Sequence, residues 1–115
     1  MQTTRVADAA PYQAAKHHDV TAVRLHGFDA SDSKAFWVGL SHYEPGGRAE
    51  RDASGTEKVY VVLEGEITVI TDGDEVVLGP LDSCYLAPGE ARSVENRSAE
   101  RASMLVVMEY PRSSS

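Results

Sequence analysis

Residues 50–66 read ERDASGTEKVYVVLEGE, and this stretch decides the fold. The run from Val59 to Leu63 is apolar at every position, and Glu64 and Gly65 follow it. β-Branched and aromatic residues favour a strand. A strand that is apolar on both faces is expected between two layers or at a subunit contact. Residues 50–58 are mostly charged or small, so they predict a polar segment leading into that strand.

Short strand patterns separated by turn residues continue on both sides of this run. Asp72-Gly73, placed between two apolar runs, is a strong β-hairpin signal. The segment EPGGR (residues 44–48) is predicted to turn the chain. No segment combines a helical period with caps at both ends. The expected strands are residues 20–25, 36–43, 59–63, 66–71, 74–78, 83–86, 92–95 and 103–110, which indicates an all-β sandwich or barrel.

Composition limits the class of protein. With 115 residues the chain is expected to form one domain with its own core. The net charge of -7 argues against a nucleic-acid partner and against an anionic membrane surface. The single cysteine, Cys84, excludes an internal disulfide and a cysteine-built zinc site. The N-terminal residues lack the apolar core of a secretory signal, so a cytoplasmic location is expected.

The chain is expected to divide into an arm, a domain and a tail. Residues 1–19 are predicted to be a loosely ordered or dimer-swapped N-terminal arm, residues 20–110 the β-barrel domain, and residues 111–115 a disordered tail. A homodimer is expected, because it would cover the doubly apolar strand and give the arm a partner.

The order of several motifs resembles a known family over roughly residues 36–109. These motifs are YEPGG (43–47), VYVVLEGEITV (59–69), DGDEVVLGPLDS (72–83) and YLAPGEARSVEN (85–96). As a set, they resemble a small single-domain cupin. The resemblance implies a cupin-type jelly-roll β-barrel (a double-stranded β-helix), and in most members a metal held by three histidines and a glutamate. A fold alone does not imply a function.

The chain departs from this family at the positions of the metal ligands. Counting back from Gly65 puts Lys58 in the glutamate slot, and the two histidine slots of the first motif fall on Asp52 and Ser54, or on Arg51 and Ala53. In the second motif Arg92 takes the histidine slot. A one-residue bulge would turn Glu57 inward instead of Lys58. Protonated lysine and arginine have no lone pair for a metal, so no metal cofactor is expected.

Two cations in one pocket need compensation, and this leaves two readings of the site. Carboxylates of Asp52, Glu57 or Glu64 could form an ion-pair network with Lys58 and Arg92. Alternatively, the pair could bind an anionic small molecule. Arg92 would hydrogen-bond a carboxylate or enolate, and Lys58 would act as a point charge or acid–base group. Isomerisation, cyclisation or decarboxylation would then be possible reactions. A non-catalytic binding or sensor protein whose pocket is closed by ion pairs is the alternative, and a metalloenzyme with unusual ligands is a further one.

Further side chains are candidates for the pocket. Tyr60 shares the face of Lys58, and Cys84 is expected to face inward as a small packed residue. His42 shares a strand face with Phe36, Val38 and Leu40, opposite Trp37 and Tyr43, so it would line the barrel if that apolar face points inward. His42, Asp52 and Glu57 form the candidate set for an unusual metal site. The adjacent His17 and His18 are predicted to be a solvated surface pair.

Overall fold

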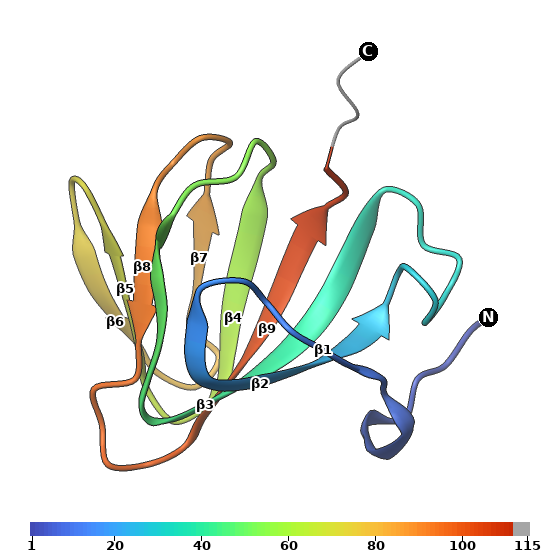
Figure 1. Cartoon of the computed structure of the whole chain (residues 1–115), viewed down its shortest axis with the longest axis horizontal. Coiled ribbons are helices and arrows are strands. Elements are labelled where there is room, and N and C mark those ends of the chain that lie inside the picture. The colour runs from blue at the N-terminus through green and yellow to red at the C-terminus, as the bar shows by residue number, and fades with distance from the viewer. Residues whose placement is uncertain (112–115) are drawn as a thin grey trace.

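The structure is a computed structural model that describes residues 1–111, and it forms nine strands and one turn of 3-10 helix within them (Figure 1). The predicted tail lies outside the described residues beyond Pro111. No helix of the described part is long and apolar enough to cross a membrane. The elements in chain order are η1 (Val6–Asp8), β1 (Pro11–Tyr12), β2 (His17–His26), β3 (Phe36–Asp52), β4 (Lys58–Glu64), β5 (Ile67–Thr71), β6 (Glu75–Leu78), β7 (Ser83–Leu86), β8 (Arg92–Glu95) and β9 (Ala102–Glu109).

The strands form one antiparallel sheet that rolls into a nearly closed barrel (Figure 1). Seven strands follow the order β6-β5-β8-β3-β9-β4-β7, and β2 adds to β3 with β1 at its outer side. Apart from the β5–β6 pair, neighbours in this order are not consecutive in the sequence, as expected for a jelly roll. The prediction of an all-β barrel is therefore confirmed.

The predicted strand from Val59 is β4, and it pairs with β9 on one side and with β7 on the other. Gly65 ends it with a φ of +77°, where a Cβ would lie 2.7 Å from the carbonyl oxygen of Arg101. Only glycine fits this close approach in the left-handed region. The Asp72-Gly73 hairpin is also confirmed, because β5 and β6 pair directly across it.

The segment EPGGR does not turn the chain, so that prediction is wrong. It lies inside β3, which runs on to Asp52. Before this segment β3 pairs with β9, as in Tyr43 with Ala102, and after it β3 pairs with β8, as in Arg48 with Glu95. Gly46, with a φ of +82°, allows the backbone to bend while the strand continues. The bend therefore carries one strand from one side of the barrel to the other.

The first long strand, β2, begins at His17, three residues before the expected start at Val20. The register shifts between His18 and Val20, at Asp19 with its φ of +55°, so an irregularity hid the start of the strand. The chain just before β1 is also paired: the Arg24 N–H donates to the Ala10 carbonyl (2.9 Å). Exchange of the N-terminal arm between subunits remains a prediction.

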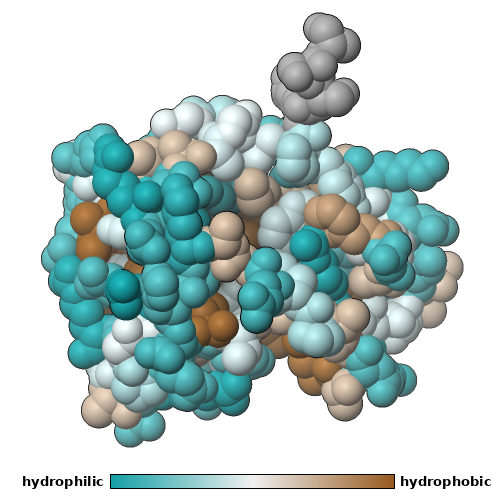
Figure 2. Space-filling model, viewed as in Figure 1, coloured by the Kyte–Doolittle hydropathy of each residue, from teal (hydrophilic) through white to brown (hydrophobic). Residues whose placement is uncertain are grey.

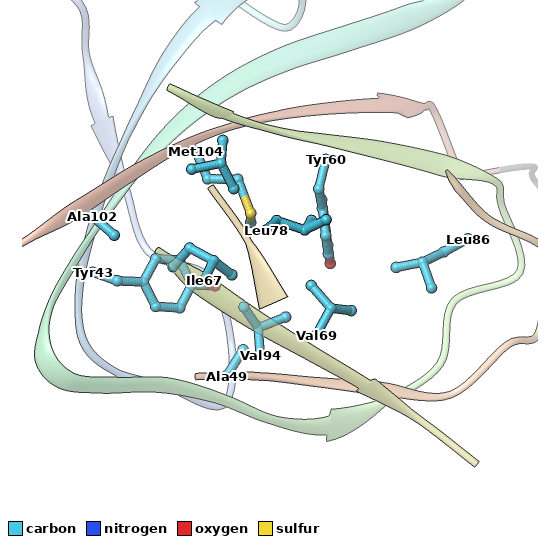
Figure 3. Packing of buried hydrophobic residues seen from close by; sticks show 11 residues of the cluster. Tyr43, Ala49, Tyr60, Ile67, Val69, Leu78, Leu86, Val94, Ala102 and Met104 are labelled. Atoms are coloured by element: carbon cyan, nitrogen blue, oxygen red, sulfur yellow. The ribbon is translucent and has the colours of Figure 1, made fainter. Parts of the chain in front are cut away.

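Buried apolar side chains fill one part of the barrel interior. Figure 3 shows them pointing toward one another from strands on opposite sides of the barrel. Val62, Ile67 and Val94 have no exposed surface. Burying a side chain of this size stabilises the folded state by about 1.5–3 kcal/mol. In Figure 2 the viewed face is mainly hydrophilic, with separate small apolar areas between polar ones.

Candidate functional site

The remaining part of the barrel interior is a cavity of about 280 Å³. Strands β3, β4, β8 and β9 supply most of its wall, and the loop between β1 and β2 supplies residues 13–15. Figure 1 shows this loop in front of β4 and β9. The polar and aromatic side chains at the cavity are Tyr12, Gln13, His17, Arg24, Trp37, Ser41, Tyr43, Asp52, Ser54, Lys58, Tyr60 and Arg92.

Lys58 and Arg92 both face this cavity, although they come from different strands. Lys58 begins β4 and is 5% exposed, and Arg92 begins β8 and is 8% exposed. Arg92 Nε donates to Tyr60 Oη (2.8 Å), and Nη1 donates to the Glu50 carbonyl (3.0 Å). Lys58 Nζ donates to Ser54 Oγ at 3.4 Å. The family's ligand slots thus meet at one place, with Lys58 rather than Glu57 pointing inward.

No carboxylate of residues 1–111 forms an ion pair with Lys58 or Arg92. Asp52 lies at the edge of the cavity and pairs instead with Lys16, 3.5 Å away. Glu57 is exposed and accepts a hydrogen bond from Tyr85 Oη (3.1 Å). The ion-pair network considered for the two cations is therefore not formed within the described residues.

The charges around the cavity shift the pKa of the lysine. Burial, and next the positive charge of Arg92, lower the pKa of Lys58 to about 8, while Asp52 opposes the shift. The backbone N–H of Ala53 and the ammonium of Lys16 lower the pKa of Asp52. At neutral pH the cavity therefore holds a cationic lysine and arginine, with an anionic Asp52 at its rim.

Tyr60 and His17 add groups that are neutral at pH 7. Burial raises the pKa of Tyr60, so its hydroxyl stays protonated while it accepts the bond from Arg92. Burial, and then the charge of Arg92, lower the pKa of His17. His17 Nδ1 donates to the Ala15 carbonyl (2.8 Å), which leaves the lone pair on Nε2. The prediction that His17 is a solvated surface residue is wrong, because the β2 register turns it toward the cavity.

The other predicted site residues lie elsewhere. His42 is on the opposite face of β3 from Tyr43, and its Nδ1 hydrogen-bonds Ser103 Oγ (2.8 Å). The apolar face of Phe36 and His42 thus points away from the cavity. Cys84 is paired with Tyr60 across β4 and β7 and packs against the core, where burial raises the pKa of its thiol. A buried thiol with a raised pKa is a poor nucleophile.

The residues present do not fit the metal that the cupin fold usually holds. Asp52, Ser54, Lys58 and Arg92 stand around the cavity in place of the family's ligands, and two of them are cations without a lone pair. The alternative ligand set of His42, Asp52 and Glu57 does not converge, because only Asp52 lines the cavity. Residues 1–111 contain no group of three or more histidine, cysteine, aspartate or glutamate side chains placed to bind a metal.

The aromatic wall of the cavity was not predicted. Trp37 lies on β3, and the ring of Tyr12 on β1 meets it edge-on with centroids 5.8 Å apart. Gly39 makes room for this contact, since a Cβ there would lie 2.5 Å from Tyr12 Oη. Strand alternation correctly placed Trp37 and Tyr43 on one face. It could not tell which face pointed inward, because both faces of this strand carry large apolar side chains.

Comparisons with known proteins agree with this architecture. The Cupin domain family matches residues 39–108. The chain is 50% identical over 111 residues to the beta-D-galactosidase Rv1717 of Mycobacterium tuberculosis, and the match covers 96% of both chains.

Solved structures show the same fold at low sequence identity. The polyketide cyclase RemF of Streptomyces resistomycificus superposes with a TM-score of 0.84 at 18% identity, over 95% of this chain and 79% of that one. A predicted oxalate decarboxylase of Thermotoga maritima gives a TM-score of 0.80 at 23% identity, over 95% of this chain and 98% of the other. The barrel, the motif order and these matches agree: the chain belongs to the cupin family, and it lacks that family's usual metal ligands.

Proposed function

We propose that the barrel cavity binds a small β-galactoside that carries an anionic group, and that the chain cleaves its glycosidic bond. Lys58 and Arg92 would hold the anionic group. The observation that supports this proposal most strongly is the pair of buried cations in one cavity, with no ion-pair partner among residues 1–111.

An anion would relieve the unfavourable charge arrangement of the cavity. Two cations that share a buried site repel each other, and burying a charge without a partner is costly. Nη2 of Arg92 makes no hydrogen bond within the described residues, whereas Nε and Nη1 are anchored by Tyr60 and Glu50. An anchored guanidinium with free donors suits a carboxylate, and the lysine ammonium adds a point charge.

The sugar part of the proposal rests on the relative and on the cavity wall. The Mycobacterium tuberculosis relative is named a beta-D-galactosidase and matches nearly the whole chain. Trp37 and Tyr12 give the cavity an aromatic side, while Ser41 and Ser54 line it with hydroxyls. A pyranose ring has an apolar C–H face and a polar rim, so it suits a cavity with an aromatic wall and a few polar groups.

The cavity also contains groups that could move protons. Glycoside hydrolysis needs a proton for the leaving oxygen and a base for water. Lys58, with a pKa near 8, is mostly protonated at pH 7 and could donate, while neutral His17 or the Asp52 carboxylate could accept. The transition state is positively charged at the sugar ring. Beside Lys58 and Arg92 it would be destabilised unless the substrate brought its own anion.

Two other functions remain as alternatives. A non-catalytic binding or sensor protein would use the same cationic cavity without turning its ligand over. An isomerase, cyclase or decarboxylase would use the two cations to stabilise a developing enolate, but no contact among residues 1–111 favours one of these reactions. The structural neighbours named for such reactions are less than 25% identical, so they support the fold alone.

The proposal predicts that the protein releases phenol from phenyl β-galacturonide, which carries a carboxylate at C6. We expect this acid to raise the melting temperature in a thermal-shift assay, and phenol to accumulate in proportion to protein concentration. Phenyl β-galactoside, which is neutral at C6, is the control and should respond more weakly. Stabilisation without phenol release would favour the non-catalytic alternative. If neither glycoside shifts the melting temperature, the β-galactoside proposal fails.

A further inference from the structure

A second cavity of about 580 Å³ lies beside the barrel cavity. Residues 3–5 and 8–11 form one side of it, and Phe28–Ala30, in the loop after β2, form another. Figure 1 shows η1 and this loop on the same side of the barrel. We call it the outer cavity. Its wall comes from the N-terminal segment and from the β2–β3 connection.

Tyr12 and Arg24 line both cavities, so they form the wall between them. The guanidinium carbon of Arg24 lies 4.1 Å from the ring centre of Tyr12, 3.7 Å from that of Phe28 and 4.8 Å from that of Trp37. Phe28 lines the outer cavity, and Trp37 lines the barrel cavity. Because the rings of Phe28 and Trp37 are in edge contact at 5.8 Å, aromatic surface runs from one cavity into the other.

Arg24 holds an unused hydrogen-bond donor in this wall. Its Nη1 is buried and has no hydrogen-bond partner, and the residue forms no ion pair within the described part of the chain. The three surrounding rings offset its charge only partly, because a ring face does not replace a hydrogen-bond acceptor. An acceptor on a compound lying across the wall would satisfy this donor.

The position of Phe28 is maintained against a backbone preference. Its φ is +53°, a region that bulky residues rarely adopt. Its N–H donates to Tyr110 Oη (2.8 Å), and Tyr110 Oη donates to the Ser33 carbonyl (2.8 Å). The residue is nevertheless 49% exposed. Strain of this kind, held by surrounding contacts, is common at ligand-binding positions.

We infer that the two cavities are subsites of one binding site. The barrel cavity would hold the sugar, and the outer cavity would hold the aglycone, an apolar or aromatic group that stacks on Phe28. Arg24 would donate to an oxygen of the compound where it crosses the wall. This inference rests on the proposed function, and it adds that substrates with an aromatic aglycone are preferred over those with a methyl group.

The test compares phenyl and methyl β-galacturonide by isothermal titration calorimetry. For the wild type we expect the phenyl compound to bind about tenfold more tightly. The variant Phe28→Asn removes the ring and suits the positive φ, so it should fold. Whatever its absolute affinities, it should lose most of this preference, so that the ratio of phenyl to methyl affinity falls toward one. Phe36→Ala, a similarly exposed phenylalanine that lines neither cavity, should keep the preference.

The possible outcomes distinguish a failure of the subsite inference from a failure of the proposed function. If both glycosides bind and Phe28→Asn keeps the wild-type ratio, the outer cavity is not the aglycone subsite, although the sugar proposal stands. If wild-type affinities for the two compounds are equal, the inference also fails. If methyl β-galacturonide does not bind at all, the proposed function itself is contradicted, and the subsite inference fails with it.

Discussion

Replacing Arg92 with methionine is expected to weaken the binding of methyl β-galacturonide by about 1.5–3 kcal/mol, roughly ten- to 150-fold. The substitution keeps an apolar side chain of similar length but removes the anchored guanidinium, which supplies the charge-assisted hydrogen bonds. It also leaves Tyr60 Oη and the Glu50 carbonyl without their donor. Calorimetric titration of the purified variant measures the loss directly.

A surface arginine provides the matched control. Arg97 is exposed and pairs with Glu75 and Glu95, so Arg97→Met should leave the affinity unchanged. Arg92→Lys keeps the positive charge but loses the planar guanidinium with its several donors, and it should bind with intermediate affinity. An Arg92→Met variant that is folded and binds the acid as tightly as the wild type would show that this guanidinium does not hold the ligand.

Replacing Lys58 with methionine is expected to stabilise the ligand-free protein at pH 7. Its free energy of unfolding should rise by an amount on the order of 2 kcal/mol. The buried ammonium is held beside Arg92 without a carboxylate partner within residues 1–111. Methionine fills a similar volume without the charge. Denaturant unfolding monitored through Trp37, the only tryptophan, gives the difference.

Titration of the same lysine should make stability and ligand affinity change in opposite directions as the pH rises. Its folded-state pKa of about 8 lies below that of the unfolded chain. Between these values the unfolded chain binds more protons, so wild-type stability should rise with pH from about 8 to 10. Over the same range Lys58 loses its charge, and the affinity for methyl β-galacturonide should fall. Both trends should disappear in Lys58→Met.

Lys34→Met is the control for this pair of measurements, since Lys34 is exposed and lines neither cavity. It should change neither the stability nor its pH profile appreciably. A Lys58→Met variant that is markedly less stable than the wild type at pH 7 would mean that the ammonium is compensated in the folded protein, contrary to the charge arrangement described above.

The fold was largely predictable because its strongest signals are local. The apolar run from Val59 and the Asp72-Gly73 turn each specify a structure within a few residues, and both appear as β4 and the β5–β6 hairpin. The error at residues 44–48 has a physical reason. A glycine pair marks a bend, but only the tertiary partners β9 and β8 decide whether the strand ends there or continues.

Residues of the site could be predicted only where they occupy defined positions in the family's motifs. Lys58, Arg92 and Tyr60 follow from counting along the motifs, and they meet in one cavity. His42 was placed by a strand alternation that fits either face, so its inward orientation could not be decided. Arg24, Tyr12 and Phe28 give no sequence signal, because the pairing of β1 with β2 and the path of the loop after β2 bring them together only in the folded chain.

The substitution of lysine and arginine for metal ligands has a consequence for the family's chemistry. A metal ion and a pair of cationic side chains both place positive charge at the same position of the barrel, so either can stabilise an anionic group there. The two side chains, unlike a single metal ion, repel each other when no anion lies between them. This repulsion lowers the stability of the folded protein, and we propose that binding of an anionic ligand restores that stability.

The central claim is that the barrel cavity selects the anionic group of its ligand. Its most direct test is the affinity of the wild type at pH 6.5 for methyl β-galacturonide and for methyl β-galactoside, which differ only at C6. Calorimetry should give a dissociation constant at least about tenfold lower for the acid, a difference of roughly 1.4 kcal/mol. Equal affinities, or tighter binding of the neutral sugar, would contradict the claim.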